Sequence, residues 1–422
     1  MPIGRHTHPI WNRLAIVRPL AHRDFRLLWF GQTISAFGNA IFGVALPFQV
    51  LALRGSAVQL GTAFALSTGT SLVALLFGGV IVDRVSRRRV ILASDLLSGV
   101  VVAAVAGLGL SGHLTIAIIY VAAVFFGAAS AFYLPAMGAI VPELVPADVL
   151  IAGNSLRGLS RQVNRVIGPL VGGVLVSGIG PPAAFAVDAA TFFVSFVIFL
   201  ASSATVVAAV KRPSLFADLK EGIRYTASIP WLWITIFAFS VINFFDLAPL
   251  TVGLPLLVHE VIGGGARTFG FIGAAAGVGE LIATLTVSQL NVRRVGIYLY
   301  TVASVEGLAF LAIGLYPALP LVMVANALFA ACVVAFTVVW DSLLQKEVPR
   351  PLLGRVVSLD WFGAILLGPA APIFGALLAQ RSGPRSVFVI CGVFAFVLSL
   401  AGLAIPAVRH LRLTEAVVDD SR

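Results

Sequence analysis

Residues 84–110 read RVSRRRVILASDLLSGVVVAAVAGLGL, a basic cluster followed by a long apolar run. Between Val90 and Leu110 the only charged residue is Asp95. An apolar segment of about 20 residues crosses the hydrocarbon core of a bilayer as a helix, and a basic cluster at its start is typical of the cytoplasmic boundary. The segment therefore predicts a membrane span that begins on the cytoplasmic side.

The rest of the chain has the same character. Of its 422 residues 59% are hydrophobic and 11% are charged, and its mean hydropathy is +1.03, whereas soluble domains are about 25% charged. Spanning segments must satisfy their own backbone hydrogen bonds, which helices do. We expect an all-α membrane protein with twelve transmembrane helices. Their predicted ranges are 25–51, 58–82, 90–110, 114–141, 166–180 with a start near Gly153, 183–208, 231–258, 268–290, 296–315, 319–344, 357–379 and 386–408.

The basic residues alternate between the two sides of this layout. All but four of the 28 Lys and Arg residues fall in the two tails or in every second connection. The exceptions are Arg54, Arg267, Arg381 and Arg385. Because cytoplasmic loops carry the excess of Lys and Arg, we expect an inner-membrane protein with both termini in the cytoplasm.

The composition also argues against several other functions. The net charge of +10 does not indicate a nucleic-acid partner, because the basic residues lie in short clusters between apolar runs. Cys332 and Cys391 lie inside apolar runs, and His259-Glu260 lacks a second His at metal-binding spacing. We expect no enzymatic activity, no cofactor, no metal and a monomeric protein.

The chain divides near its middle. Its longest connection, 209–230, separates predicted six-helix halves at 1–208 and 231–422. An offset of about 200 residues aligns several features of the halves, including Gly168-Pro169 with Gly368-Pro369, which indicates an internal repeat with pseudo-symmetric halves. Within the connection, apolar residues recur at helical spacing and predict an amphipathic helix on the cytoplasmic membrane surface. These residues are Phe216, Leu219 and Ile223.

Three segments resemble a known family. GVIVDRVSRRR at 79–89 is similar to the signature loop of the major facilitator superfamily, and GPLVGG at 168–173 is similar to the motif of its drug antiporters. With AVDAATF at 186–192, the whole chain most resembles bacterial macrolide and enterobactin exporters. The resemblance implies a secondary transporter that exports drugs or siderophore-like compounds by proton antiport with alternating access. Import of a nutrient stays open, since a fold does not fix function.

The loop between the second and third predicted spans has the parts of a conformational latch. A glycine allows close helix contact, an aspartate lies just before a helix start, and arginines can pair with it or with lipid phosphates. A breakable ion pair at a helix junction would give two packings of similar energy; the alternative is a plain cytoplasmic basic cluster. The latch residues are Gly79, Asp83, Arg84, Arg87 and Arg88. In the antiporter motif, we expect Gly168, Pro169, Gly172 and Gly173 to form a close-packed and bent helix, with simple tight packing as the alternative.

Ionisable residues inside spans are costly and are therefore candidates for function. Seven acids qualify: Asp95, Asp188, Asp246, Glu280, Glu306, Asp341 and Asp360. Asp246, Glu280 and Glu306 lie nearest the midplane. The resemblance places the ninth span at the periphery, which sets Glu306 aside and favours Asp246 and Glu280 for proton coupling. The alternative is that these carboxyls are hydrogen-bonded for packing.

The resemblance places the seventh and tenth spans at the substrate cavity, so aromatic residues on these spans are candidates for its lining. Asparagines in the first and seventh spans are further polar groups at that depth. Such residues hold bulky amphipathic or cationic molecules by stacking and by attraction between a cation and an aromatic ring. Ordinary core or lipid contact is the alternative for each ring. The candidates are Asn39, Asn243, Phe244, Phe245, Phe336 and Trp340.

Overall fold

The computed structural model describes residues 15–203, 215–290 and 292–411, and within these ranges it leaves out the side chains of residues 15, 76–84, 134, 139 and 215–219. Every regular element in these ranges is a helix. The chain folds as two compact units, one of Met1–Val210 with Val258–Gly277 and the other of Lys211–Leu257 with Val278–Arg422. We call them unit 1 and unit 2.

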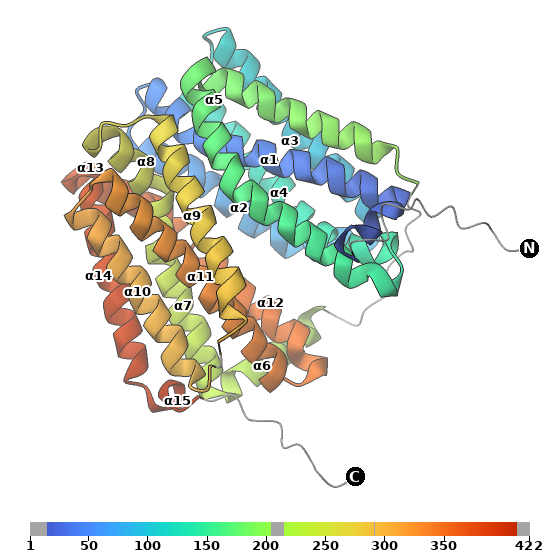
Figure 1. The fold of residues 1–422 in the computed structure, drawn as a ribbon, viewed down its shortest axis with the longest axis vertical. Coiled ribbons are helices and arrows are strands. Elements are labelled where there is room, and N and C mark those ends of the chain that lie inside the picture. The colour runs from blue at the N-terminus through green and yellow to red at the C-terminus, as the bar shows by residue number, and fades with distance from the viewer. Residues whose placement is uncertain (1–14, 204–214, 291, 412–422) are drawn as a thin grey trace, which may run out of the picture. The chain divides into compact units, whose positions relative to one another are not determined.

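In unit 1, long helices pack in pairs. Helix α1 lies along α5, α2 along α4, and α3 against both α4 and α5 (Figure 1). At one end of these helices, Phe25, Leu28, Ile91 and Phe199 form part of a buried apolar cluster. The elements are η1 Ala15–Ala21, α1 Arg23–Ala52, α2 Ala57–Arg84, α3 Arg87–Leu110, α4 Ile116–Leu144, η2 Ala147–Val149 and α5 Leu150–Leu200.

Helix α5 is two spans joined by a reversal. Its backbone leaves helical geometry at Gly180, where φ is +81° and ψ is 160°, a conformation that suits glycine because it has no Cβ. Pro181 and Pro182 follow, and proline lacks the N–H that would continue the helix. The bend is visible where the two green segments of α5 meet (Figure 1). The predicted fifth and sixth spans are therefore present, with outer limits at Leu150 and Leu200.

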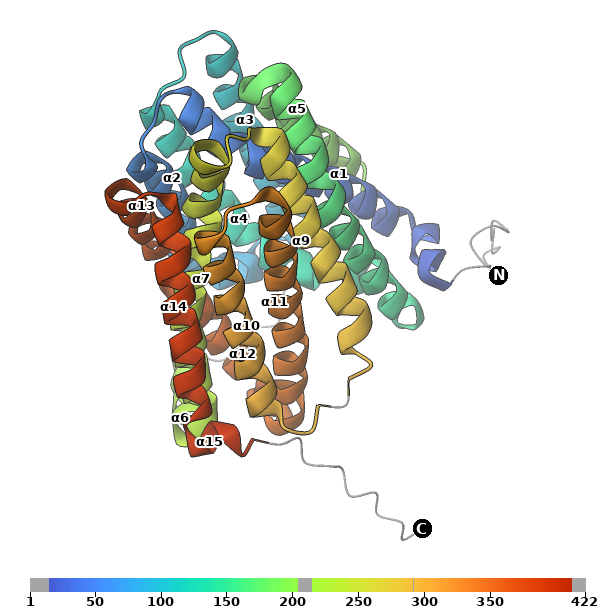
Figure 2. The ribbon, with the colours of Figure 1, turned by 60° about the vertical axis from the view of Figure 1, so that its left-hand side comes forward.

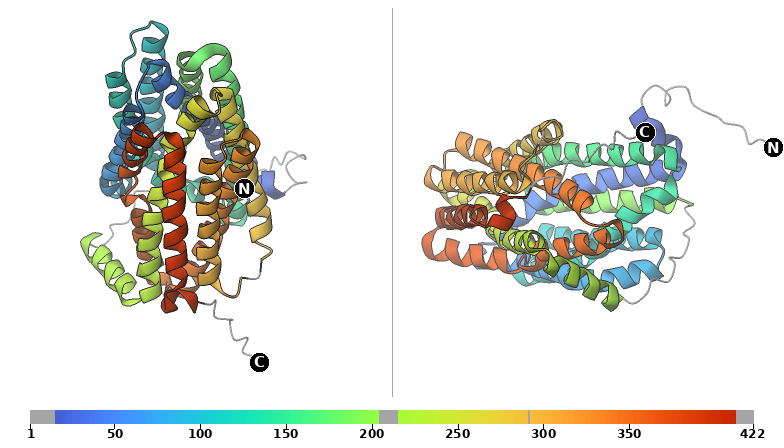
Figure 3. Two further views of the ribbon diagram at one scale, coloured as in Figure 1. Left: turned by 90° about the vertical axis from the view of Figure 1, so that its left-hand side faces the viewer. Right: turned by 90° about the horizontal axis from the view of Figure 1, so that it is seen from below.

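Unit 2 has a comparable helical core. Helix α10 lies between α11 and α14 (Figure 2), and α14 also lies beside α7 (Figure 3). The elements are α6 Leu215–Ser228, α7 Pro230–Ala248, the π-helix η3 Pro249–Gly253, α8 Leu254–Leu256, α10 Val295–Leu315, α11 Leu319–Glu347, α12 Arg350–Leu366, α13 Ala370–Ser382, α14 Pro384–Leu403 and α15 Pro406–Arg409. The π-helix η4 Leu257–Val261 and α9 Ala266–Val287 pass from one unit to the other.

The described residues contain 11 helical stretches long and apolar enough to cross a membrane. One of them, Ala147–Leu200, holds the Gly180 reversal and counts as two, which makes twelve and confirms the predicted fold class. Two spans differ in detail from the prediction. The seventh runs through π-helical turns to Val261, and the eleventh breaks between Leu366 and Ala370, where Pro369 cannot donate a backbone hydrogen bond.

The predicted boundaries 1–208, 209–230 and 231–422 follow chain order and stay a prediction. Within the middle range lies α6, where Gly222 and Thr226 are buried and Ile223 is exposed. Glu221 Oε2 accepts a hydrogen bond of 2.6 Å from Arg355 Nη1 of α12. The side chains of Phe216 and Leu219 lie outside the described residues, so the position of α6 on the membrane surface also stays a prediction.

Candidate functional site

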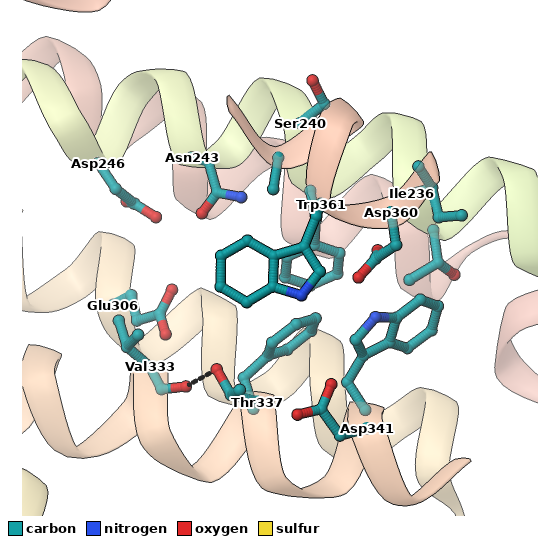
Figure 4. A pocket seen from close by; sticks show the side chains of 15 residues that line it. Ile236, Ser240, Asn243, Asp246, Glu306, Val333, Thr337, Asp341, Asp360 and Trp361 are labelled. Carbon is teal, nitrogen blue, oxygen red and sulfur yellow. Dashed lines mark hydrogen bonds between the residues drawn. The ribbon is translucent and has the colours of Figure 1, made fainter. Parts of the chain in front are cut away.

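Unit 2 contains a cavity of about 150 Å³. Four helices line it, and each contributes polar or aromatic side chains that converge (Figure 4). Helix α7 supplies Asn243 and Asp246, α10 supplies Glu306, α11 supplies Phe336, Thr337, Trp340 and Asp341, and α12 supplies Asp360 and Trp361.

Two buried carboxyls face each other at one end of this cavity. The side chains of Asp246 and Glu306 point toward one another from α7 and α10 (Figure 4). Only 7% of Asp246 and 4% of Glu306 is exposed, and their charges interact. The Oδ1 atom of Asp246 is buried and has no hydrogen-bond partner among the residues that the structure describes. A buried polar atom without a partner costs about 1–3 kcal/mol, so this atom is not explained by packing.

Two more carboxyls lie on the other side of the Trp361 ring. Asp341 is exposed and Asp360 is half-buried, and their charges also interact. Figure 4 shows the indole of Trp361 between this pair and the pair of Asp246 and Glu306. None of the described residues that line the cavity is Lys, Arg or His. The site therefore holds four acids without a matching positive charge from its own lining.

Aromatic rings form much of the remaining wall. Phe336 stacks on Trp340 with ring centroids 6.1 Å apart, and it lies 4.0 Å from the ring of Phe239. Trp361 is 61% exposed although it lines the cavity. These rings offer faces to a molecule in the cavity, and aromatic faces attract cations.

A second pocket, of about 220 Å³, lies within unit 1 between α1, α4 and α5. Its lining includes Gln32, Tyr133 and the cationic Arg157 and Arg161. Behind it the buried carboxyl of Asp95 accepts two hydrogen bonds at Oδ2. They come from Gln32 Nε2 at 3.0 Å and Ser195 Oγ at 2.7 Å, while Tyr133 donates to Gln32 Oε1. Asp95 therefore belongs to a polar network that engages its Oδ2.

The predicted cavity residues divide between these places. Asn243, Phe336 and Trp340 line the unit 2 cavity, whereas Asn39 lines the unit 1 pocket. The rings of Phe244 and Phe245 are outside both linings and pack against Phe374, and Phe245 also stacks on Phe394.

The two acids predicted to couple protons do not line the unit 2 cavity together. Asp246 lines it, but Glu280, half-buried on α9, is absent from its lining. Glu306, which the resemblance set aside, takes the place beside Asp246. From the sequence, Asp341 and Asp360 had been identified only as acids near span ends. No sequence pattern had identified Trp361 as a cavity residue.

The predicted latch is described in part. Gly79, Asp83 and Arg84 belong to the last turns of α2, and their side chains lie outside the described residues. Arg87 forms an ion pair with Glu143 near the end of α4.

Arg88, the remaining latch residue, bonds to the end of α5. Its Nη2 donates a 2.8 Å hydrogen bond to the carbonyl of Leu200. The start of α3 is therefore tied to the ends of two other helices. Glu143, the partner of Arg87, was not identified from the sequence.

The glycines of the antiporter motif allow close helix contacts. A Cβ at Gly168 would collide with Ala40 of α1, and one at Gly172 would lie 3.1 Å from the Cα of Ile41. Gly173 and Pro169 lie against Gly270 of α9. These residues therefore show tight packing. The α5 backbone leaves helical dihedral angles at Gly180 and not at Pro169, and a bend of the helix at Pro169 stays a prediction.

Comparison with known proteins places this architecture in a family. A sequence model of the transmembrane secretion effector family matches residues 15–418. The chain belongs to this family. It is a branch of the major facilitator superfamily, which confirms the resemblance of the signature segments.

Relatives and solved structures agree with this assignment. The chain is 27% identical over 407 residues to the multidrug efflux pump Tap of Mycolicibacterium fortuitum, covering 92% of this chain and 97% of Tap. It is 27% identical over 415 residues to the enterobactin exporter EntS of Escherichia coli K12, covering 95% and 96%.

Two solved transporters share the fold. The nucleoside transporter NupG matches with a TM-score of 0.71 at 12% identity, covering 90% of this chain and 98% of that chain. A bacterial homologue of the iron transporter ferroportin, in an inward-facing state, matches with a TM-score of 0.69 at 16% identity, covering 91% and 99%. The protein is therefore a multi-pass membrane transporter and not an enzyme.

Proposed function

We propose that this transporter exports small amphipathic molecules, drugs or siderophore-like compounds, across the bacterial inner membrane. The observation that carries the proposal is the unit 2 cavity, with the unpartnered, buried Asp246 at membrane depth and aromatic walls. The names of the relatives Tap and EntS support outward transport, because both describe efflux or export.

Proton antiport with alternating access is the mechanism that we propose for it. Asp246 and Glu306 repel each other when both are ionised, and the cavity lining supplies no cation. A proton that binds there from one side and leaves to the other would drive exchange for the substrate. Glu280 stays a second candidate for this role because it also lies on a spanning helix.

The proposed latch would bias the two access states. Arg87 already pairs with Glu143 across two helices, and Asp83 with Gly79, Arg84 and Arg88 would complete the junction. Breaking and remaking such contacts gives an element with two stable arrangements. The distribution of Lys and Arg supports cytoplasmic termini, and we propose a monomer as the transporting unit.

Everted membrane vesicles test the proposal. Vesicles from expressing cells should accumulate some members of a panel of fluorescent dyes, antibiotics and siderophores, and a protonophore should abolish the accumulation. Asp246→Asn should abolish it too, whereas Asp148→Asn, which changes an exposed acid between α4 and α5, should not. Accumulation only in right-side-out vesicles would contradict export and establish import.

A separate variant tests the latch. Asp83→Asn should slow transport while leaving binding of the same compounds unchanged, because a latch acts on the exchange between states. Unchanged transport by Asp83→Asn would contradict a role of Asp83 in the latch.

A further inference from the structure

The unit 2 cavity is lined by four acids. Asp246, Glu306, Asp341 and Asp360 come from four different helices and all reach one space of about 150 Å³. Acids brought together in this way are repulsive, and ionised groups inside a membrane protein are stabilised by pairing. The described lining residues contain no positive side chain that could supply the pairing.

The Asp246 carboxyl shows where a partner belongs. It is more than nine-tenths buried, and its buried Oδ1 has no hydrogen-bond partner within the described part of the chain. The carboxyl group as a whole points into the cavity (Figure 4). By contrast Asp95, equally buried in unit 1, accepts hydrogen bonds from Gln32 and Ser195. A hydrogen-bond donor inside the cavity would therefore complete what the protein leaves open at Asp246.

The size and the walls of the cavity restrict the rest of the ligand. Its volume of about 150 Å³ is large enough for a molecule the size of benzene. Phe336, Trp340 and Trp361 line the same cavity, and the ring of Trp361 lies between the two pairs of acids (Figure 4). Aromatic faces favour an apolar ring and also attract a cation.

We propose that the unit 2 cavity binds an organic cation, an ammonium group on a benzene-sized apolar body, as the transported molecule or its recognised part. The ammonium lies between Asp246 and Glu306, and the ring lies against Trp361. The inference rests on the proposed function in taking this site as the substrate site. A neutral analogue would leave the carboxyls without a counter-charge, and an anion would be repelled.

Three probes of similar size test the charge rule on the purified full-length protein in lipid nanodiscs. They are 2-phenylethylammonium, the neutral 2-phenylethanol and the anion phenylacetate, and calorimetry measures the affinity of each. We expect the cation to bind at least about tenfold more tightly than the alcohol, with phenylacetate weaker still.

Variants locate the site. Asp246→Asn and Glu306→Gln should each weaken binding of the cation by about tenfold or more, with little change in affinity for the alcohol. Trp361→Ala should lower the affinity for both the cation and the alcohol, and Trp361→Phe should lower these affinities less. The control Asp148→Asn changes an exposed acid outside the cavity and should bind as the unmodified protein does.

Equal affinities for the cation and the alcohol, no binding of the cation, or full cation affinity in both Asp246→Asn and Glu306→Gln would each overturn the inference. Binding in nanodiscs is measured without a proton gradient. It therefore tests the cation site independently of the transport that the proposed function requires. A charge-selective protein that transports nothing in vesicles would contradict the proposed function, and export without charge selectivity would contradict the cation site.

Discussion

Unit 1 and unit 2 both bury carboxyls inside helical bundles, and the surroundings of Asp95 and Asp246 differ. Asp188 of unit 1 also has a buried oxygen without a hydrogen-bond partner among the described residues, but it lines neither the unit 1 pocket nor the unit 2 cavity. Asp95 in unit 1 accepts hydrogen bonds from Gln32 and Ser195, with Tyr133 bonded to Gln32 behind it. Asp246 in unit 2 has an unpartnered oxygen and a second acid, Glu306, beside it. The comparison teaches that burial alone does not mark a functional acid. An acid with satisfied hydrogen bonds stabilises the fold, whereas one left unsatisfied in a cavity is available to a ligand or proton.

The largest expected effect is on transport by Asp246→Asn. We expect vesicle accumulation to fall at least about tenfold, because the variant removes the charge that binds a proton or a cation. The melting temperature should be unchanged or higher, since removing an uncompensated buried charge relieves its cost. A stable Asp246→Asn variant with normal transport would contradict a role of Asp246 in transport.

The converse effect is expected for Asp95→Asn. Replacing this carboxylate disturbs two hydrogen bonds and should lower the free energy of unfolding by about 1–3 kcal/mol. A melting curve measured in the same detergent as Asp246→Asn checks this difference. Transport per folded molecule should stay close to normal, and its complete loss would show that Asp95 acts beyond the fold.

Unit 1 offers an independent check of tight packing. Gly172→Val should destabilise the protein by about 1–3 kcal/mol, because a Cβ there would already lie 3.1 Å from the Cα of Ile41. Gly178→Val is the control on the same helix, since a Cβ built at Gly178 meets no described atom within 4 Å beyond its own stretch of helix. Equal melting temperatures for the two variants would contradict close packing of α5 on α1.

The smallest expected effect on stability concerns the latch. Glu143→Gln removes the ion pair with Arg87, whose side chains are 21% and 26% exposed. Such a partly solvated pair should contribute no more than about 1 kcal/mol to the free energy of unfolding. Its transport rate should change more than its melting temperature does. A large loss of stability in Glu143→Gln would show instead that the ion pair of Arg87 and Glu143 mainly stabilises the fold.

Most of the fold could be predicted because the bilayer fixes the length of each span. The reversal after the fifth span was expected near Gly180, where positive φ and two following prolines end the helix. Other boundaries depend on local backbone geometry that hydropathy does not report. The π-helical turns that continue α7 to Val261 and the break at Gly368-Pro369 are of this kind.

The site could be predicted in part. On α7 the lining residues Ile236, Ser240, Asn243 and Asp246 recur every three or four positions, which places them on one face of the helix. Phe244 and Phe245 follow directly in sequence but rotate onto other faces, where they meet Phe374. Helical spacing from Asp246 was thus a usable signal that depth alone did not provide.

Two other features needed the packed structure. Glu306 had been set aside on the expected position of its helix, yet its side chain points at Asp246 (Figure 4). The convergence of Asp341, Asp360 and Trp361 depends on how α11 and α12 are rotated about their axes. Sequence periodicity gives the faces of one helix, but it does not say which faces of two helices meet.

The most direct test of the account is transport of radiolabelled 2-phenylethylammonium into everted vesicles containing equal amounts of folded protein. The account predicts gradient-dependent accumulation by the unmodified protein and by Asp95→Asn, and none by Asp246→Asn. Equal accumulation by all three proteins, or loss in Asp95→Asn and Asp246→Asn alike, would contradict the claim that the unsatisfied acid of unit 2 is the transporting one.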